Sequence, residues 1–313
     1  MKALVFGSAN LDRTYHVSRF VAEGETVSCL GMEEACGGKG FNQAIALCRA
    51  GADTVFAGAV GKDGSPLVDC LVEDGVDTRH LLRRDMPSGH AVIQLDPEGR
   101  NCIIVCPGAN DSVSESDVDD VLGSFSAGDM LVVQNEMSST GRAIRVAHEL
   151  GMIVALNPSP FDERILDWDI DCADYLFVNE VEGRLLSGME DPETILGNLH
   201  SRLPHTFIVL TLGEQGSRCI GPDGVVRSAA AMSVDVVDTT AAGDTFTGYF
   251  LASRLRGESI DEASLLASVA SGLAVTRCGA APSIPKLEEV VVLASTYGYL
   301  NRACDGYGQP DGR

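Results

Sequence analysis

Short apolar runs separated by helical patterns dominate the chain. They occur at residues 2–8, 54–61, 130–134, 153–156, 175–178 and 207–211. Runs of this length are typical of strands buried on both faces, whereas a buried helix needs about ten residues or more. Because strand and helix patterns alternate along the chain, the sequence predicts an α/β fold with a doubly wound, mainly parallel sheet flanked by helices.

Two segments depart from this alternation, at about residues 13–35 and 88–106. In both, β-prone residues alternate with polar ones and no helical pattern intervenes. We expect them to form a small β lid on one α/β domain that spans residues 1–298. The chain from about 242 to 298 has mainly helical patterns, and residues 299–313 have no packing pattern, so we expect a loosely held C-terminal tail.

Composition and charge limit the possible partners and the compartment. The 313 residues are 45% hydrophobic and carry a formal net charge of -22, which disfavours nucleic acids and anionic membranes as partners. Neither a leader pattern nor an apolar run of about 18 residues is present in the sequence. The ten cysteines form no CxxC pair and the six histidines are scattered. These features predict a cytoplasmic protein with reduced, buried thiols.

Polar residues and glycine follow several of the predicted strands. In parallel sheets, ligands bind outside the carboxyl ends of the strands, so these positions are candidates for a site. Their alternative interpretation is that they simply form turns. The positions are Asn10, Asp12, Glu136, Asn157, Asn179 and Gly213.

The segment from Asp238 to Phe246, with the sequence DTTAAGDTF, is the most specific feature. A helix that begins at Ala242 or Gly243 would direct free backbone amides towards one point, which suits a phosphate group. Phosphoryl transfer needs little beyond such amides and one placed carboxylate. Asp244 would be that carboxylate and would accept the proton of an attacking hydroxyl. Otherwise, Asp244 would merely cap the helix.

A second glycine-rich segment, GGKGFNQA, runs from Gly37 to Ala44 and opens another predicted helix. Its glycines would let the main chain approach a polyol, and Asn42 could donate to and accept from neighbouring hydroxyls. The segment is not a Walker A loop. Neither GxxxxGK[ST] nor GxGxxG occurs in the sequence, which counts against a P-loop NTPase and against an NAD-dependent dehydrogenase.

These motifs, in this order, resemble the ribokinase group of the PfkB carbohydrate kinases. The resemblance extends from Gly7 to about Pro285. It implies an ATP-dependent sugar kinase with the ribokinase-like fold. The further segments that carry it are GSANLD (7–12), NPSP (157–160), NEVE (179–182), TLGEQG (211–216) and AVTRCGAAPSIP (274–285).

The resemblance also implies roles for individual residues. Asp244 resembles the catalytic base, with Ala242 and Gly243 in the anion hole. The residues that resemble the sugar-binding set are Asn10, Asp12, Gly38, Lys39, Gly40, Asn42 and Glu136. Those that resemble the ATP-binding set are Asn179, Thr211, Gly213, Gly216, Gly243 and Ser268.

ATP, Mg²⁺ and K⁺ are the implied ligands. Glu182 belongs to the NxxE element that resembles a water-mediated magnesium site. The residues that resemble the monovalent-cation site are Asp238, Thr240, Ala274, Arg277, Gly279 and Ser283. Two positions depart from the family pattern: Ser268 stands where Asn or His often lies near adenine, and Phe41 would reshape the sugar pocket if it faced the sugar.

Several functions remain open at this stage. Transfer from ATP to the 5-hydroxyl of D-ribose fits the motifs best, and deoxyribose, fructose or a nucleoside are alternative acceptors because small changes in a pocket shift specificity. A non-catalytic sugar or nucleotide sensor is the alternative from another class, although Asp244 and Gly243 disfavour it. We also expect a homodimer that pairs through the exposed edges of the β lids.

Overall fold

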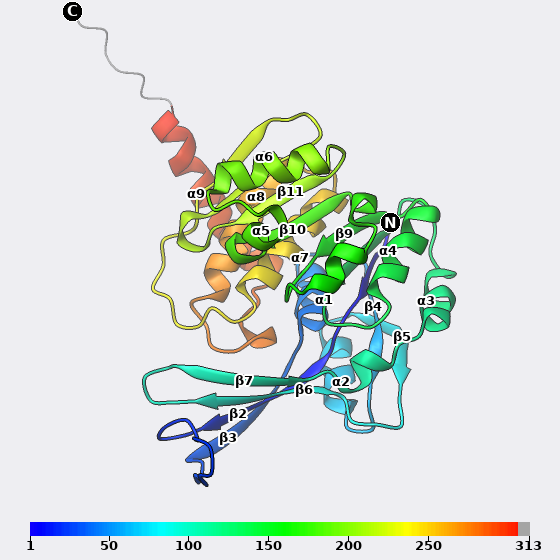
Figure 1. The fold of residues 1–313 in the computed structure, drawn as a ribbon. Coiled ribbons are helices and arrows are strands. Elements are labelled where there is room, and N and C mark those ends of the chain that lie inside the picture. The colour runs from blue at the N-terminus through cyan, green and yellow to red at the C-terminus, as the bar shows by residue number, and fades with distance from the viewer. Residues whose placement is uncertain (306–313) are drawn as a thin grey trace, which may run out of the picture.

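The computed structural model describes the backbone of residues 1–305 and the side chains of residues 1–296. A nine-stranded sheet forms its centre (Figure 1). The strand order across the sheet is β13 (Val226–Ala229), β12 (Ser217–Ile220), β11 (Phe207–Thr211), β10 (Tyr175–Asn179), β9 (Ile153–Asn157), β8 (Met130–Gln134), β1 (Ala3–Phe6), β4 (Thr54–Val60) and β5 (Asp77–Arg83). The strands from β11 to β5 pair in parallel, and β12 and β13 pair antiparallel at one edge. The predicted doubly wound sheet is therefore confirmed.

Helices cover both faces of this sheet, and alternate residues along each central strand point to opposite faces. Ala3 and Val5 belong to one buried cluster, and Leu4 and Phe6 to the other. The first cluster also contains side chains of α1 (Lys39–Arg49), α2 (Ser65–Glu73), α7 (Ala242–Leu255), α8 (Ile260–Ala274) and α9 (Leu287–Asp305). The second contains side chains of α3 (Glu115–Leu122), α4 (Thr140–Glu149), α5 (Glu180–Ser187) and α6 (Pro192–Arg202).

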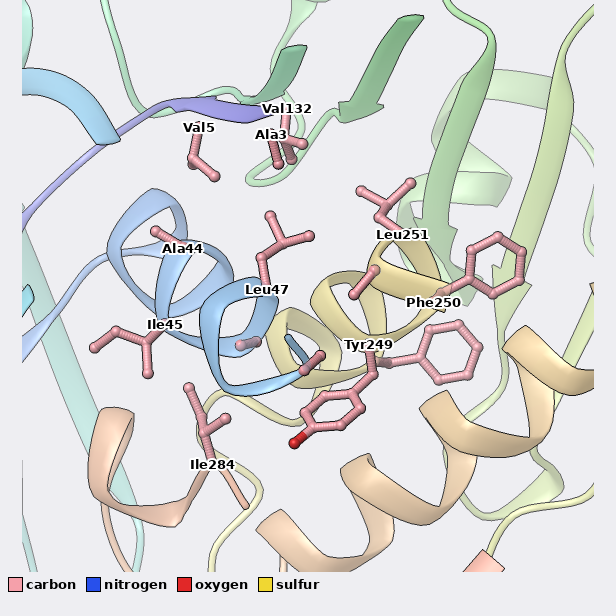
Figure 2. Packing of buried hydrophobic residues seen from close by; sticks show 14 of the residues in the cluster. Ala3, Val5, Ala44, Ile45, Leu47, Val132, Tyr249, Phe250, Leu251 and Ile284 are labelled. Carbon is pink, nitrogen blue, oxygen red and sulfur yellow. The ribbon is translucent and has the colours of Figure 1, made fainter. Parts of the chain in front are cut away.

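The first cluster joins the two helices that begin at the glycine-rich motifs. Helix α1, which carries Ala44 and Leu47, lies beside α7, which carries Tyr249 and Leu251, and all four side chains belong to the first cluster (Figure 2). The Tyr249 hydroxyl donates a hydrogen bond to the carbonyl of Pro285 at 2.7 Å. Since both helices are anchored in one core, their N-termini are held in a constant relation to each other.

A separate four-stranded sheet projects from this body (Figure 1). Its strand order is β3 (Gly31–Gly37), β2 (Asn10–His16), β6 (Gly89–Leu95) and β7 (Asn101–Cys106). All four strands lie in or next to the two segments from which we expected a lid. The final helix, α9, continues to Asp305, past the expected start of the tail at residue 299, and residues 306–313 lie outside the described part.

Candidate functional site

The glycines of the Gly37–Ala44 segment bring two backbones into contact. A Cβ on Gly40 would lie 2.6 Å from the Cα of Gly7 and from the backbone nitrogen of Ser8. Gly38, which precedes α1, has a φ of 98°, a conformation that favours glycine. The start of α1 can therefore approach the end of β1 only because Gly40 and Gly7 both lack side chains.

Polar groups from three segments meet at this junction. The Lys39 amide donates to Oε2 of Glu136 at 3.0 Å, and the Ser8 hydroxyl makes a short hydrogen bond to the same oxygen. Glu136 follows β8, whereas Ser8 follows β1, the neighbouring strand. The predicted sugar-binding residues Lys39 and Glu136 are thus adjacent, and Ser8 is a partner that the sequence did not indicate.

Asp12 lies on β2 at the base of the lid. Burial raises the pKa of its carboxyl to about 6, and the nearby Glu136 carboxylate adds to the increase. Gly37 lies two residues beyond Ala35, which pairs with Asp12 on β3, and a Cβ on Gly37 would clash with Oδ2 of Asp12. This carboxylate is partly desolvated before any ligand binds, so hydrogen bonds from sugar hydroxyls would compensate a cost that the protein already carries.

Asn10, the other predicted sugar residue of β2, is oriented by a buried amide. Nδ2 of Asn110 donates to Oδ1 of Asn10 at 2.8 Å, and Oδ1 of Asn110 accepts from the Ala9 amide at 3.2 Å. Asn110 is 1% exposed. Asn110 was not predicted from the sequence, because it lies in a short 3₁₀ turn that carries none of the recognised motifs.

Asp244 lies in the first turn of α7 and is 7% exposed. Its Oδ2 accepts from Nδ2 of Asn42 at 3.1 Å, and its Oδ1 accepts from Nε2 of Gln43 at 2.9 Å. The structure therefore brings together the two glycine-rich motifs, about 200 positions apart in sequence. Oδ1 of Asn42 is buried without a hydrogen-bond partner among the described residues, as expected of an acceptor that serves a ligand.

Two cavities adjoin at the N-terminus of α7. The larger has a volume of about 620 Å³, and the predicted ATP residues among its lining are Thr211, Gly213, Gly216, Gly243 and Ser268. The smaller has a volume of about 220 Å³, and its lining includes Lys39, Asn179, Glu182 and Asp244. Both are lined by Ala242 and Gly243, so the backbone at the start of α7 lies between them.

The start of α7 has an unusual backbone. Ala241, the N-cap, has a φ of 59°, in the left-handed region that residues with a Cβ seldom adopt. This turn directs the amides at the start of the helix towards the cavities. A Cβ added to Gly243 would meet no described atom within 4 Å, so the space beside it is open to a ligand.

Positive charge in the smaller cavity comes from Lys39. Burial lowers the pKa of its ammonium group, but the carboxylates of Asp244, Glu136 and Glu182 outweigh this effect, so the pKa is raised. Lys39 therefore stays charged in a partly enclosed space. A cation there suits a phosphate group passing between the cavities.

Asn179 and Glu182 form a capping box at the N-terminus of α5. Oδ1 of Asn179 accepts from the Glu182 amide at 2.9 Å, and Oε2 of Glu182 accepts from the Asn179 amide at 3.1 Å. This pairing fixes both side chains at the edge of the smaller cavity. The same spacing of residues that stabilises the helix thus presents a buried carboxylate to the site.

The predicted cation-site segments lie side by side. The amides of Val237 and Asp238 both donate to the carbonyl of Val275, at 2.8 and 3.2 Å. Oδ2 of Asp238 accepts from the Gly279 amide at 2.9 Å. Burial raises the pKa of Asp238, but hydrogen bonds from Thr240 and Gly279 outweigh this effect, so the pKa is lowered and Asp238 is an anion.

No group of three His, Cys, Asp or Glu side chains in the described residues could hold a metal ion. The remaining predicted cation residues differ in their surroundings. Ala274 and Ser283 are buried, and Ser283 donates to the carbonyl of Ala280 at 2.7 Å. The Arg277 guanidinium instead forms an ion pair with Glu289 at 2.5 Å. Among the described residues, these segments offer the carboxylate of Asp238 and backbone carbonyls, and not the cluster of thiolates or imidazoles that a transition metal prefers.

Comparison with known proteins agrees with this geometry. The model of the "pfkB family carbohydrate kinase" matches residues 1–287. The chain belongs to the pfkB family of carbohydrate kinases. The ribokinase of Haemophilus influenzae is 33% identical over 298 residues, which cover 92% of this chain and 96% of the relative. The ribokinase of Staphylococcus aureus is 34% identical over 303 residues, which cover 92% of this chain and 98% of the relative.

Solved structures give the same assignment. The structure of Arabidopsis thaliana ribokinase complexed with ribose and ATP has a TM-score of 0.83 to this carbohydrate kinase, at 30% identity over 94% of this chain and 98% of that one. Ribokinase from Cryptococcus neoformans in complex with ADP has a TM-score of 0.83 at 32% identity, and the match covers 93% of this chain and 99% of that one. This pfkB chain is therefore an ATP-dependent carbohydrate kinase.

The structure answers the open question about Phe41 and corrects one expectation about the thiols of this kinase. Phe41 is 0% exposed and belongs to the hydrophobic core, so it does not face the sugar. The thiols are not all buried: Cys29, Cys102 and Cys278 are exposed, because two of them lie in the lid region and one in a surface turn. The described cysteines are free, as expected. No helix of the described part is long and apolar enough to cross a membrane.

Proposed function

We propose that this carbohydrate kinase transfers the γ-phosphoryl group of ATP to the 5-hydroxyl of D-ribose, with Asp244 as the catalytic base. The position of Asp244 carries the proposal. Its carboxylate lies at the start of α7, lines the smaller cavity, and accepts hydrogen bonds from two side chains of α1. A base must lie within hydrogen-bond reach of its substrate, and this location adjoins both the sugar residues and the larger cavity.

In the proposed reaction, Asn10, Asp12 and Glu136 bind and orient the hydroxyls of the sugar. Asp244 accepts the proton of the reacting hydroxyl, whose oxygen forms a bond to the γ-phosphorus. The bond from that phosphorus to the β,γ-bridging oxygen breaks, and ADP leaves. Backbone amides of Ala242 and Gly243 stabilise the charge on the transferred group, and enclosure strengthens this interaction.

The larger cavity would hold ATP, with the loop from Thr211 to Gly216 on one side and Ser268 near the adenine ring. Its volume of about 620 Å³ falls in the range of small-molecule sites. Lys39 then lies near the γ-phosphate. The ribokinase structures complexed with ADP and with ribose and ATP support the binding of a nucleotide by this chain.

Mg²⁺ and K⁺ belong to the proposal. Glu182 and Asn179 would hold Mg²⁺ through water, and Asp238 with carbonyls of the 274–283 loop would hold K⁺. When bound, Mg²⁺ would neutralise part of the negative charge on the phosphates. Asp238 would remain charged at neutral pH because of the hydrogen bonds that it accepts, which suits a cation site beside the start of α7.

We further propose a cytoplasmic homodimer that pairs through the lids. Strand β7 lies at one edge of the lid sheet, and Ile103, Ile104 and Val105 are 52%, 63% and 57% exposed. Consecutive exposed apolar residues on an edge strand favour burial against another strand. In such a dimer each lid would help to close the sugar site of its partner.

The alternative acceptor best supported is deoxyribose, since the deoxyribokinase of Salmonella typhi is 29% identical over 299 residues. The loss of one hydroxyl from the acceptor changes discrimination only modestly in an apolar pocket but strongly where a buried polar group pairs with it. Asp12 and Glu136 are polar groups of this second type. We propose that one of them pairs with the hydroxyl that deoxyribose lacks, which would favour ribose.

A coupled ADP-release assay tests the function. With Mg-ATP, with and without K⁺, we expect turnover in the order ribose above deoxyribose, fructose, adenosine and pseudouridine. Asp244→Asn should lower kcat about 10²–10⁴-fold, because general-base catalysis contributes this much. Its KM for ribose should change little.

Asp120→Asn, at an exposed position on α3, is the matched control and should keep wild-type kcat. Full activity of Asp244→Asn would rule out its role as the base. If no acceptor supports turnover in the wild-type protein, the substrate lies outside this panel or the protein is a sensor.

A further inference from the structure

A buried chain of amides links the central sheet to Asp244. Gln134 at the end of β8 donates from Nε2 to Oε1 of Gln43 at 2.7 Å. Gln43 donates from Nε2 to Oδ1 of Asn157 at 3.1 Å and to Oδ1 of Asp244 at 2.9 Å. Asn157 donates from Nδ2 to the carbonyl of Phe177 at 2.9 Å. Three neighbouring strands, β8, β9 and β10, thus contribute to one network.

This network leaves Gln43 a single amide orientation. A primary amide has two N–H donors and one carbonyl oxygen. In Gln43 both donors face carbonyl or carboxylate oxygens, and the oxygen faces the Nε2 group of Gln134. A flipped amide would place two oxygens together at Asp244 and two NH₂ groups together at Gln134, so the flip is disfavoured.

Burial increases the effect of this network on Asp244. Gln43 and Gln134 are both 0% exposed, and Asp244 is 7% exposed. Water cannot substitute for the Gln43 donor at such a site, and a buried carboxylate without donors is costly. Rotation of Asp244 about its side-chain bonds would break the hydrogen bonds from Asn42 and Gln43 at once.

From this we infer that Gln43 is a positioning residue, which holds Asp244 in the orientation that accepts the proton of the substrate. Asn42 differs from it because Asn42 also has a buried oxygen available to a ligand. Gln43 has no such free atom, since each polar atom of its amide pairs with protein. Its effect on the reaction therefore passes through Asp244. The inference depends on the proposed role of Asp244 as the base.

Gln43→Met tests the inference, because methionine has a similar length and no donor. We expect kcat to fall about tenfold to a hundredfold, since small misplacements of a reacting group have effects of this size. KM for ribose and for ATP should stay within about threefold, because Gln43 touches neither cavity's ligand in the proposed arrangement. A purely structural role would lower thermal stability and leave kcat per folded molecule unchanged.

A double-mutant cycle separates the two roles. If Gln43 acts through Asp244, then Gln43→Met should cause no further loss of kcat in the Asp244→Asn background. Additive losses, or a wild-type kcat in Gln43→Met, would overturn the inference. The role of Asp244 as the catalytic base is tested separately. Full activity of Asp244→Asn would rule it out, whatever the kcat of Gln43→Met.

Gln43→Glu provides a second variant if Gln43→Met does not fold. Glutamate conserves the length and the acceptor for Gln134, but it replaces the donor to Asp244 by a carboxylate oxygen. We expect a loss of kcat at least as large as that expected for Gln43→Met, because two carboxylates at this distance repel each other. A folded Gln43→Glu protein with wild-type kcat and KM would refute the positioning role.

Discussion

The Asp12 carboxyl lowers the stability of the protein at neutral pH, at a position where we propose that it binds the sugar. Burial and Glu136 raise its pKa from 3.8 to about 6. The folded state therefore binds this proton more tightly than the unfolded chain does. The free energy of unfolding falls as the pH rises from about 4 to about 6, and the loss is complete above this window.

Asp12→Asn should therefore stabilise the protein at neutral pH. The shift in pKa corresponds to roughly 2–3 kcal/mol at pH 7, and this gain should decrease towards zero near pH 4. Urea unfolding at pH 7 and at pH 4.5 would measure it. The same variant should bind ribose at least tenfold more weakly, since the asparagine side chain offers one acceptor in place of two carboxylate oxygens.

Asp69→Asn on α2 is the control, because Asp69 is exposed. It should change neither the stability nor the affinity. Equal stabilities of Asp12→Asn and wild type at both pH values would show that the Asp12 carboxyl is solvated in the folded protein. In the wild type, KM for ribose should rise as the pH falls below about 6, because Asp12 then becomes protonated.

Among the elements, α1 is the one whose placement depends most on missing side chains. Gly40 in its first turn touches Gly7 at the end of β1, and its last turn carries Arg49, which donates to the carbonyls of Ala281 and Ile284 at 2.8 and 2.6 Å. Helix α1 thus connects the backbone at the end of β1 with the loop that follows α8. A displacement of α1 would affect both.

Gly40→Ala should displace this helix. The added Cβ would lie 2.6 Å from backbone atoms of Gly7 and Ser8, which cannot rotate away. We expect a loss of about 1–3 kcal/mol in the free energy of unfolding, as is usual for an overpacked site. KM for ribose should rise as well, and urea unfolding together with the ADP-release assay would measure the two effects.

Gly197→Ala is the matched control within α6. A Cβ on Gly197 would meet no described atom within 4 Å, and alanine favours a helix interior by about 1 kcal/mol relative to glycine. This variant should be as stable as wild type or more so, with unchanged kinetics. If Gly40→Ala behaved in the same way, the contact between α1 and β1 would be looser than the structure indicates.

At the scale of the whole molecule, the lid has one layer and therefore little core of its own. Only Leu11 and Ala91 of its strands are buried hydrophobic residues, at 2% and 6% exposure. A four-stranded sheet without a covering layer is weakly stabilised unless something packs on it. The proposed edge pairing of two lids would extend this sheet and bury the exposed apolar residues of β7.

Ile104→Asp on β7 should disrupt that pairing. A charge on the apolar strand would have to be desolvated in a dimer, so we expect sedimentation at micromolar concentration to change from a dimer to a monomer. The ribose affinity should fall in parallel if each lid closes its partner's site. Leu166→Asp is the control, since Leu166 is 57% exposed and lies in a 3₁₀ turn that is not part of the lid sheet.

A monomeric wild-type protein in the same experiment would contradict the dimer proposal directly. A dimer that persists in Ile104→Asp would place the interface elsewhere on the surface. Either result leaves the assignment of the catalytic residues unchanged, because these all lie on one chain.

Much of the fold and of the site could be predicted from the sequence. The six apolar runs correspond to strands β1, β4, β8, β9, β10 and β11, since buried parallel strands need continuous apolar sequence. Strands β5, β12 and β13 were not predicted, because they are short or half-exposed and lack that signal. Local motifs likewise indicated Asp244, Asn42 and Gly38, because each lies in a short glycine-containing segment that is recognisable from adjacent residues.

Only the tertiary structure decided which distant side chains meet. The sequence determined the strand and helix periods, the helix starts and the family motifs, because these depend on residues close together in the chain. The buried side-chain hydrogen bonds of Gln43 and Asn110 join positions about 90 to 200 residues apart, and the place of Phe41 in the core likewise depends on distant segments. A residue type alone does not reveal such partners, since an amide suits a turn, a surface or a buried network equally well.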